Sequence, residues 1–222
     1  MGRYGQLYGA AVLRPFAEQL AAALDVQPGQ TVCDLLCDEG ELTRALAPRV
    51  APGGTVLAAD IDTVIRHGAV PLADGVCDAG GVLFTAGFAA NVASEARRVC
   101  GSRGRVLAAV WDLENPPAHE QVLEAALQTA ARHNSPYLRA VLSLPVASAG
   151  VSVTVHDVVR FDGFAHYWAA MVTQRLPLMA ELSAIPEAAL REAEDVTRAA
   201  LAQYAAADGT LRIPVSATFV PL

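Results

Sequence analysis

The stretch TVCDLLCDEGELTRALA, residues 31–47, decides the fold. It starts as an apolar run, passes through a turn whose only glycine is Gly40, and continues with apolar residues at helical spacing. A second apolar run, residues 55–61, follows a Pro-Gly-Gly turn. Strands that are buried on both faces read as continuous apolar runs, so two of them separated by a helix predict a βαβ unit of a parallel sheet.

The same alternation continues along the chain. Apolar runs at 76–84 and 104–111 predict two more strands, with a helix over 89–100 between them. Residues 151–161 and 210–222 alternate in polarity and predict half-buried strands. Pro214 in the last of these removes one ladder hydrogen bond, which predicts a bulge or an edge there. The expected fold is α/β, with a doubly wound, mostly parallel sheet and an antiparallel C-terminal strand. Such a sheet binds ligands at the carboxyl ends of its parallel strands.

The chain is expected to form one domain over residues 1–222. Nothing in its 222 residues resembles a linker or an internal repeat. Apolar residues at helical spacing outside the sheet predict a helical lid made of three segments, at about 1–25, 116–150 and 162–207.

Charge and composition exclude several classes of function. The net charge of −7, with no cluster of basic residues, argues against nucleic-acid and membrane partners, and a small-molecule ligand is expected instead. No apolar run is long enough for a membrane span, and the first residues lack the pattern of a signal peptide, which predicts a cytoplasmic location. A homodimer, or a heteromer with a related chain, stays open. The four cysteines form no C-x-x-C pair and are expected to be reduced core residues, with no metal site.

The landmarks of the chain resemble a known family. PGQTVCDLLCDEGELT, residues 28–43, resembles the Pro-Gly-x-x-Val-Leu-Asp-Φ-Gly-x-Gly-x-Gly-x-Leu-Thr pattern of class I S-adenosylmethionine-dependent methyltransferases, especially the small-molecule branch related to ubiquinone and menaquinone biosynthesis. TVLAADID at 55–62, VPLADGVCDAG at 70–80 and EARRVCGSRGRVLAAVW at 95–111 match later motifs in order. The resemblance implies a Rossmann-like methyltransferase fold with S-adenosylmethionine as cofactor. The implied cofactor-binding positions are Asp34, Cys37, Asp38, Gly40, Asp60 and Ile61.

Two departures from the family pattern affect the cofactor site. Leu36 and Asp38 stand where the pattern has its first two glycines, which let the backbone approach the cofactor closely. Only a few residues separate Asp62 from Val70, too few for a parallel crossover, so the usual third strand and its adjacent helix are expected to be missing. Both departures predict a degraded site and no bound cofactor. Alternatively, the turn is an ordinary strand-to-helix connection in which Asp38 caps the helix and Glu41 offsets its dipole.

One candidate catalytic pair lies late in the chain. Asp162 and His166 are four residues apart and share one face of a probable helix, where a carboxylate could orient an imidazole for acid–base chemistry. Tyr167 and Trp168 beside them could line a substrate pocket. The alternative is structural, with Asp162 as a helix N-cap and His166 half-exposed on the lid.

Other candidate residues follow the fourth strand or lie near the N-terminus. Trp111, Asp112, Glu114 and His119 are expected at the ligand-facing rim, with His119 as a weak catalytic candidate. Tyr4 and Tyr8 could contact a ligand from an N-terminal helix that closes over the pocket. Simple packing of a Pro-rich loop and of the lid is the alternative for all of them.

These observations favour one function and leave two others open. The favoured function is binding or conversion of a small apolar molecule without methylation, in secondary metabolism, which rests on analogy of fold. The first alternative is an active small-molecule methyltransferase that tolerates Leu36 and Asp38. The second is a non-catalytic partner subunit of an active methyltransferase.

Overall fold

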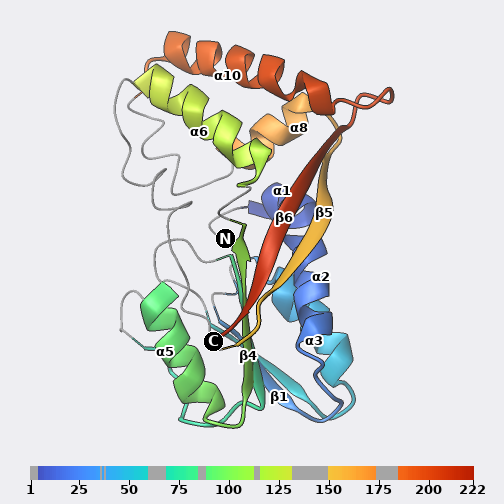
Figure 1. The fold of residues 1–222 in the computed structure, drawn as a ribbon, viewed down its shortest axis with the longest axis vertical. Coiled ribbons are helices and arrows are strands. Elements are labelled where there is room, and N and C mark those ends of the chain that lie inside the picture. Colours follow the sequence, from blue (N-terminus) through green and yellow to red (C-terminus); the bar gives the residue numbers. More distant parts are fainter. Residues whose placement is uncertain are drawn as a thin grey trace.

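A computed structural model describes residues 5–35, 37, 39–59, 69–84, 89–112, 116–131, 150–173 and 185–222. Its centre is a six-stranded sheet with the strand order β2-β1-β3-β4-β6-β5 (Figure 1). The strands are β1 (Thr31–Leu35), β2 (Thr55–Ala59), β3 (Ala79–Leu83), β4 (Arg105–Trp111), β5 (Val153–Phe161) and β6 (Leu211–Pro221). The first four run parallel, and β6 is antiparallel to both β4 and β5. The predicted mostly parallel sheet with an antiparallel C-terminal strand is therefore confirmed.

Helices cover both faces of the sheet and one end of the molecule. In Figure 1, α2 and α3 lie on one side of the sheet, α5 lies on the other, and α6, α8 and α10 gather beyond the far ends of β5 and β6. The helical elements are α1 (Gly5–Tyr8), η1 (Gly9–Leu13), α2 (Arg14–Ala23), α3 (Glu41–Val50), α5 (Ala89–Cys100), α6 (Ala118–Ala131), α8 (Phe164–Trp168), η2 (Ala169–Thr173), α10 (Glu187–Leu201) and η3 (Ala202–Tyr204). None of the described helices is long and apolar enough to cross a membrane.

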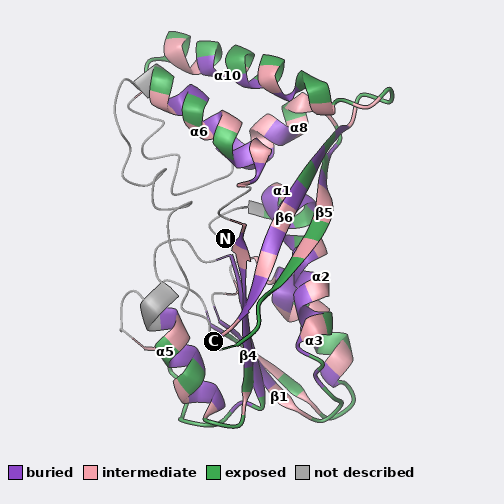
Figure 2. Ribbon diagram, in the orientation of Figure 1, coloured by how far each residue is buried: buried purple, intermediate pink, exposed green. Residues whose placement is uncertain are grey.

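The apolar faces of these elements form two cores, one on each side of the sheet. The larger joins α2, α3, the sheet and the helices at the far end, and the smaller lies between the sheet and α5. Buried residues consequently follow β3 and β4 almost without interruption, whereas in β6 they alternate with exposed or half-buried ones (Figure 2). The glycines of β3 allow this close packing, because a Cβ at Gly81 would lie 2.6 Å from Leu42 of α3.

The N-terminal helical segment, expected at about residues 1–25, is divided between Leu13 and Arg14, just before Pro15. Its first part, η1, is a π-helix, in which the N–H of Arg14 donates to the carbonyl of Gly9. Pro15, in the first turn of α2, has no N–H to continue this ladder from η1, and regular α-helical bonding resumes after it.

Pro214 lies in β6 at a position that has one neighbouring strand. It is paired with Val158 of β5, and the β5–β6 register runs from Val153↔Phe219 to Phe161↔Leu211 with no inserted residue. The pairing of β6 with β4 begins only at Ala217. β6 as a whole is an interior strand, but at Pro214 only its β5 side is paired, so the missing N–H costs no hydrogen bond to β4, and no bulge occurs in the β5–β6 ladder.

The edge strands of the sheet are β5 and β2, and no strand lies beyond β2 in the described part of the chain. Residues 60–68 lie outside the described ranges, whereas 69–78 can be followed back to the sheet. Glu95 of α5 accepts a hydrogen bond from the N–H of Val70 at 2.9 Å. Arg98, one turn later, donates to the carbonyls of Val70 and Leu72. Two charged side chains of α5 thus hold this segment against the helix.

Candidate functional site

The turn between β1 and α3 is where the family pattern would place its cofactor. Asp34, near the end of β1, is fully buried, and its carboxylate accepts hydrogen bonds from the N–H and the hydroxyl of Thr43 at 2.8 and 2.6 Å. Gly40 precedes α3 with φ of +79°, a backbone conformation that favours glycine. The buried carboxylate of Asp34 in β1 is therefore hydrogen-bonded to the first turn of α3.

The N–H donors of this turn have partners within the protein. The N–H of Cys37 donates to the carbonyl of Ala59 at 2.9 Å, and that of Gly40 donates to the carbonyl of Cys37 at 2.6 Å. With Thr43 bonded to Asp34, three N–H groups that could face a ligand at a helix N-terminus are already satisfied.

A buried carboxylate also occupies the start of α3. Glu41 is 4% exposed and forms ion pairs with Arg14 of α2 at 3.1 Å and with Arg44 at 2.8 Å. The hydrogen bond and the charge of Glu41 raise the pKa of Arg14. The protein therefore supplies its own anion at the positive end of the helix.

The N-terminal helical segment packs directly on this turn. A Cβ added to Gly9 of η1 would lie 3.1 Å from Oε1 of Glu41 and 3.6 Å from Cβ of Glu39. Oε1 of Glu39 is buried and has no hydrogen-bond partner within the described ranges. η1 therefore packs over this turn, and the side chains of Glu39 and Glu41 lie against it.

The residues of this turn fit the carboxylate group of S-adenosylmethionine poorly. Its carboxylate would need free N–H donors, but those of Cys37, Gly40 and Thr43 have partners in the protein. The carboxylate of Glu39 would also repel it, whereas that of Glu41 is neutralised by Arg14 and Arg44. Its ammonium group is different, because a buried carboxylate oxygen such as Oε1 of Glu39 could accept a hydrogen bond from it.

Aromatic side chains fill the space at the carboxyl ends of β3 and β4. Trp111, the last residue of β4, stacks on Phe84 with ring centroids 3.9 Å apart, and both rings meet Phe16 of α2 edge to face. Phe84 has φ of +47°, which is strained for a bulky residue and places it directly after β3. Trp111 was expected to line a substrate pocket, and its ring is buried in this cluster.

Buried polar contacts join the helices above the cluster. The Tyr8 hydroxyl of α1 donates to Glu120 of α6 at 2.9 Å, and the Tyr167 hydroxyl of α8 donates to the carbonyl of His119 at 2.6 Å. His119, expected at the rim, is fully buried in α6 with its ring 5.8 Å from that of Trp111. The structure therefore brings Tyr8, Tyr167 and His119 together as contacts between lid helices.

The predicted Asp162–His166 pair is in contact, in an unexpected way. Nδ1 of His166 accepts a hydrogen bond from the backbone N–H of Asp162 at 3.0 Å and lies 3.3 Å from its carboxylate. A neutral His166 therefore cannot also donate from Nδ1 to that carboxylate. The reading of Asp162 as an N-cap is wrong, because Gly163 is the N-cap and no side chain bonds there.

Trp168 and Asp112 complete the expected pocket residues that the structure describes. Trp168 stacks on Phe164 at 6.0 Å, and the N–H of Asp112 donates to the carbonyl of Ser216 in β6. The remaining predicted site residues lie outside the described residues. They are Tyr4, Leu36, Asp38, Asp60, Ile61 and Glu114.

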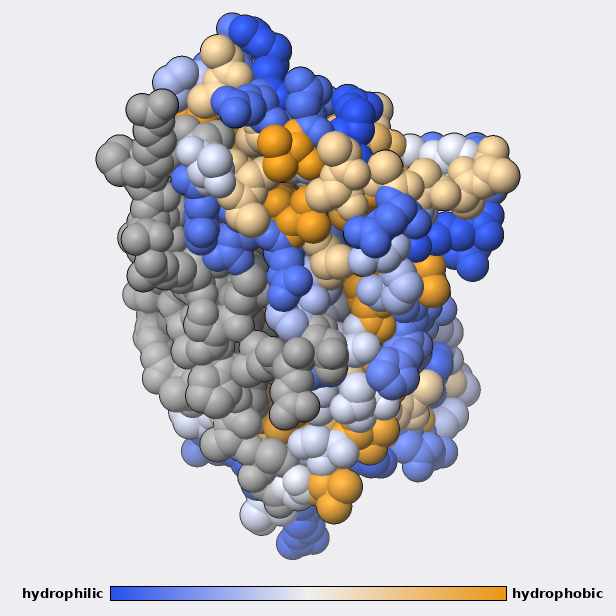
Figure 3. Space-filling model, turned by 45° about the horizontal axis from the view of Figure 1, so that its top comes forward, coloured by the Kyte–Doolittle hydropathy of each residue, from blue (hydrophilic) through white to orange (hydrophobic). Residues whose placement is uncertain are grey.

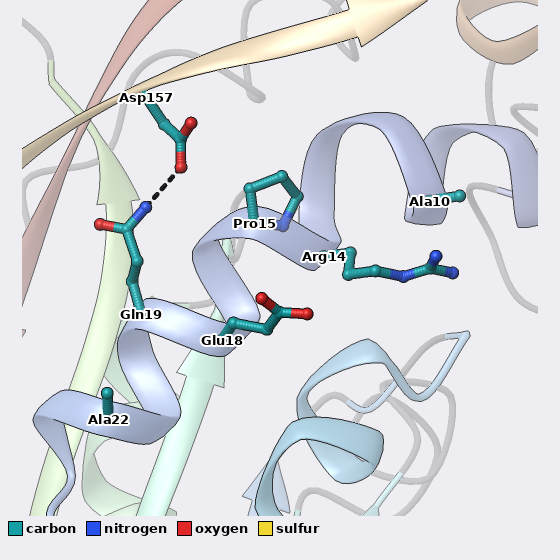
Figure 4. Close-up of a pocket in the computed structure, with 7 residues that line it drawn as sticks. All are labelled: Ala10, Arg14, Pro15, Glu18, Gln19, Ala22 and Asp157. Carbon is teal, nitrogen blue, oxygen red and sulfur yellow. Dashed lines mark hydrogen bonds between the residues drawn. The ribbon is translucent and has the colours of Figure 1, made fainter.

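A groove of about 410 Å³, which was not expected from the sequence, lies between α2 and β5 (Figure 4). Its lining residues are Ala10, Arg14, Pro15, Glu18, Gln19, Ala22 and Asp157. The amide of Gln19 donates to Asp157 across it. Arg14 and Glu18 share one helix face, which the spacing could have indicated, but their approach to Asp157 depends on the distant strand β5. Arg14 lines the groove and also holds Glu41 of the turn.

All four cysteines are free thiols, and Cys33, Cys77 and Cys100 are buried. Within the described ranges, no group of three or more cysteine, histidine, aspartate or glutamate side chains is arranged to hold a metal ion.

Comparison with known proteins places the fold. No protein-family model matches the chain, and no curated protein matches it. Among solved structures, a candidate methyltransferase from an antibiotic biosynthesis pathway of Anabaena variabilis is similar over 98% of this chain and 100% of that one, with 12% identity and a TM-score of 0.56. A candidate type II methyltransferase of Anaeromyxobacter dehalogenans is similar over 100% and 96%, with 15% identity and a TM-score of 0.48.

A SAM-dependent methyltransferase of Aquifex aeolicus also matches, with 20% identity and a TM-score of 0.37. That match covers 44% of this chain and 64% of the Aquifex chain, which is less than two thirds of its length. The chain thus has a class I S-adenosylmethionine-dependent methyltransferase-like fold. The resemblance to the ubiquinone and menaquinone branch stays a prediction from the sequence.

Proposed function

We propose that this protein does not use its methyltransferase fold for methyl transfer, and that it binds or converts a small, largely apolar molecule. A role in secondary metabolism belongs to the same proposal. Its main support is the Arg14–Glu41 ion pair at the start of α3. A buried carboxylate with its own arginine partners occupies the place where a ligand's anionic group would gain from the helix N-terminus.

The apolar character of the ligand follows from the ligand-facing edge of the sheet. The carboxyl ends of β3 and β4 carry the stacked rings of Phe84 and Trp111, which are 9% and 7% exposed, so a ligand at this edge would contact an apolar surface. Apolar and aromatic walls with few polar groups suit a largely apolar molecule. In the cluster described above, Phe16, Phe84 and Trp111 carry no charge, so a strongly polar ligand would lose its hydration there without compensation.

An active methyltransferase is the second candidate, and Glu39 favours it. A buried carboxylate oxygen without a partner is costly, and the ammonium group of S-adenosylmethionine would satisfy Oε1 of Glu39. On this reading the cofactor binds through its ammonium group, in an altered pose that does not need the N–H donors of the turn.

A partner-subunit function has weaker support. The outer edge of β2 has no neighbouring strand in the part of the chain that the structure describes. Large hydrophobic side chains exposed among these residues are Val76, Val151, Val153 and Val196, which come from three separate segments. The view in Figure 3 likewise shows hydrophobic groups scattered among hydrophilic ones. A broad apolar docking face, which a partner subunit would need, is not seen there.

A thermal melt with S-adenosylmethionine tests the main proposal. A ligand at about 100 times its Kd stabilises a protein by about 2.7 kcal/mol, which is readily seen as a rise in Tm. We expect no shift at millimolar cofactor, and little restoration by Leu36→Gly combined with Asp38→Gly. A rise in the wild type that Glu39→Gln abolishes would instead establish the second candidate.

Native mass spectrometry of the purified protein tests the ligand class. We expect a co-purified small molecule that partitions into organic solvent, and weaker retention by Phe84→Ala. A retained polar or anionic molecule would contradict the proposal.

A further inference from the structure

The groove of about 410 Å³ between α2 and β5 is a separate site, which the proposed function does not use. At about 3.6 residues per turn, the side chains of Glu18 and Gln19 point about 100° apart around α2. Pro15 and Ala22 point between these two directions. The groove therefore has an apolar strip along α2, with a polar side chain on each side of it (Figure 4).

Asp157 of β5 provides a fixed carboxylate on one side of the apolar strip. Its Oδ2 accepts a hydrogen bond from the Gln19 amide at 2.5 Å, and its Oδ1 accepts one from the N–H of Val158 at 2.7 Å. Both donors are neutral, so they orient the carboxylate without compensating its charge. Each carboxylate oxygen can accept a second hydrogen bond, so Asp157 can still bind a cation.

Glu18 provides a second carboxylate on the other side of the strip, and it is exposed. Within the described ranges, its carboxylate has no hydrogen-bond or ion-pair partner. Arg14, one turn earlier, also lines the groove, and its Nε and Nη2 donate to Glu41 at 3.1 and 3.4 Å. The described part of the lining thus presents two carboxylates against one guanidinium, and that guanidinium is already bonded to a third carboxylate.

We propose that this groove binds a linear aliphatic diamine or polyamine, with one ammonium group at Asp157 and another at Glu18. Ammonium groups donate charge-assisted hydrogen bonds to carboxylates, and these are stronger than hydrogen bonds between neutral groups. The methylene chain between the ammonium groups would lie on Pro15 and Ala22 and bury apolar surface there. A volume of about 410 Å³ lies within the range of about 300–1,000 Å³ that is usual for small-molecule sites.

A small molecule fits this place better than an added peptide strand. β5 is an edge strand, and edge strands can pair with a partner chain through their free N–H and C=O groups. Beside the groove, however, the N–H of Val158 is bonded to the Asp157 carboxylate. A peptide that paired with β5 there would have to break this bond, whereas a diamine would leave it in place.

Isothermal titration calorimetry at low ionic strength tests the proposal with putrescine, cadaverine and spermidine, and with butylamine as the monoamine control. We expect the diamines to bind more tightly than butylamine, because they engage both carboxylates. Glu18→Gln and Asp157→Asn should each weaken the binding about 2- to 5-fold. Asp157→Asn keeps an oxygen that can accept hydrogen bonds from Gln19 and Val158, and circular dichroism checks that both variants are folded. Sodium chloride at about 0.15 M should also weaken the binding, because salt screens charges near the surface.

Glu192→Gln is the matched control, since it removes the same charge from an exposed position of α10 and should leave the affinity unchanged. Equal losses in Glu192→Gln and Glu18→Gln, or butylamine that binds as tightly as putrescine, would indicate general attraction of cations to an acidic protein and overturn the proposal. Tighter binding of trilysine than of spermidine would overturn it in favour of a peptide ligand, and so would the absence of any binding. None of these outcomes bears on the proposed function, which depends on the turn and on the aromatic cluster.

Discussion

The Arg14–Glu41 pair shows how one buried charge can define a turn. The side chain of Arg14 is 52% exposed, but that of its partner Glu41 is only 3% exposed, so losing the arginine leaves a buried carboxylate with less compensation. Exposed helical pairs differ, because water replaces the lost partner at little cost.

We therefore expect Arg14→Met to lower the free energy of unfolding by about 1–3 kcal/mol. Arg191→Met is the matched control, since Arg191 is 63% exposed but its partner Glu187 is 84% exposed. That change should cost less than about 0.5 kcal/mol. Urea denaturation measures both, and equal losses would contradict a structural role for the pair in the turn.

At the same scale, Gly80 is predicted to be intolerant of a side chain. A methyl group in Gly80→Ala would push against two buried sulfurs, and we expect a loss of about 1–3 kcal/mol. Gly150→Ala is the control, because its nearest contact would be an ordinary 3.5 Å from Pro221. Thermal and urea denaturation should show a change only in the first variant.

At the scale of elements, the connection into β3 depends on two side chains of α5. The Arg98 guanidinium holds the pKa of Glu95 below its ordinary value, with help from the N–H of Val70. A carboxyl group whose pKa is lowered on folding stabilises the fold above its unfolded pKa, and that contribution is lost as the pH falls through the folded value.

Glu95→Gln should accordingly destabilise the protein by about 1.5–3 kcal/mol near pH 7. The difference between variant and wild type should shrink below about pH 4.5, where the unfolded carboxyl group is protonated. Urea denaturation at pH 7 and pH 4 measures this. A difference that is independent of pH would mean that the carboxylate charge contributes nothing.

Over the whole molecule, the larger core joins the sheet to the helices at its far end. Phe161 of β5 contacts Tyr167 of α8 edge to face at 5.2 Å and lies 6.5 Å from the ring of His119 in α6. A continuous core predicts that the sheet and these helices unfold together.

The two tryptophans allow this to be measured, because Trp111 belongs to β4 and Trp168 to α8. In each of the Trp168→Phe and Trp111→Phe proteins, the fluorescence of the remaining tryptophan and the far-ultraviolet circular dichroism should give the same unfolding midpoint in urea. Phe161→Ala should lower the free energy of unfolding by about 3–5 kcal/mol, and both midpoints should fall together. An earlier transition at Trp168 alone would show that the lid is an independent unit.

By itself, the amino-acid sequence determined the strands, the helices between them and the order in which they alternate. Burial on both faces imposes continuous apolar runs on parallel strands, as in residues 31–35 and 105–111, and those runs are local patterns. Turn residues such as Gly40 are likewise visible along the chain.

Only the tertiary structure decided which polar groups meet. Glu41 finds Arg14, Tyr8 finds Glu120, and Cys33 finds Cys100, each across a stretch of chain that no periodicity spans. These contacts depend on sheet register and helix packing, which bring distant residues within a few ångströms. For that reason the sequence placed the candidate turn correctly but could not tell that buried carboxylates and arginines would occupy it.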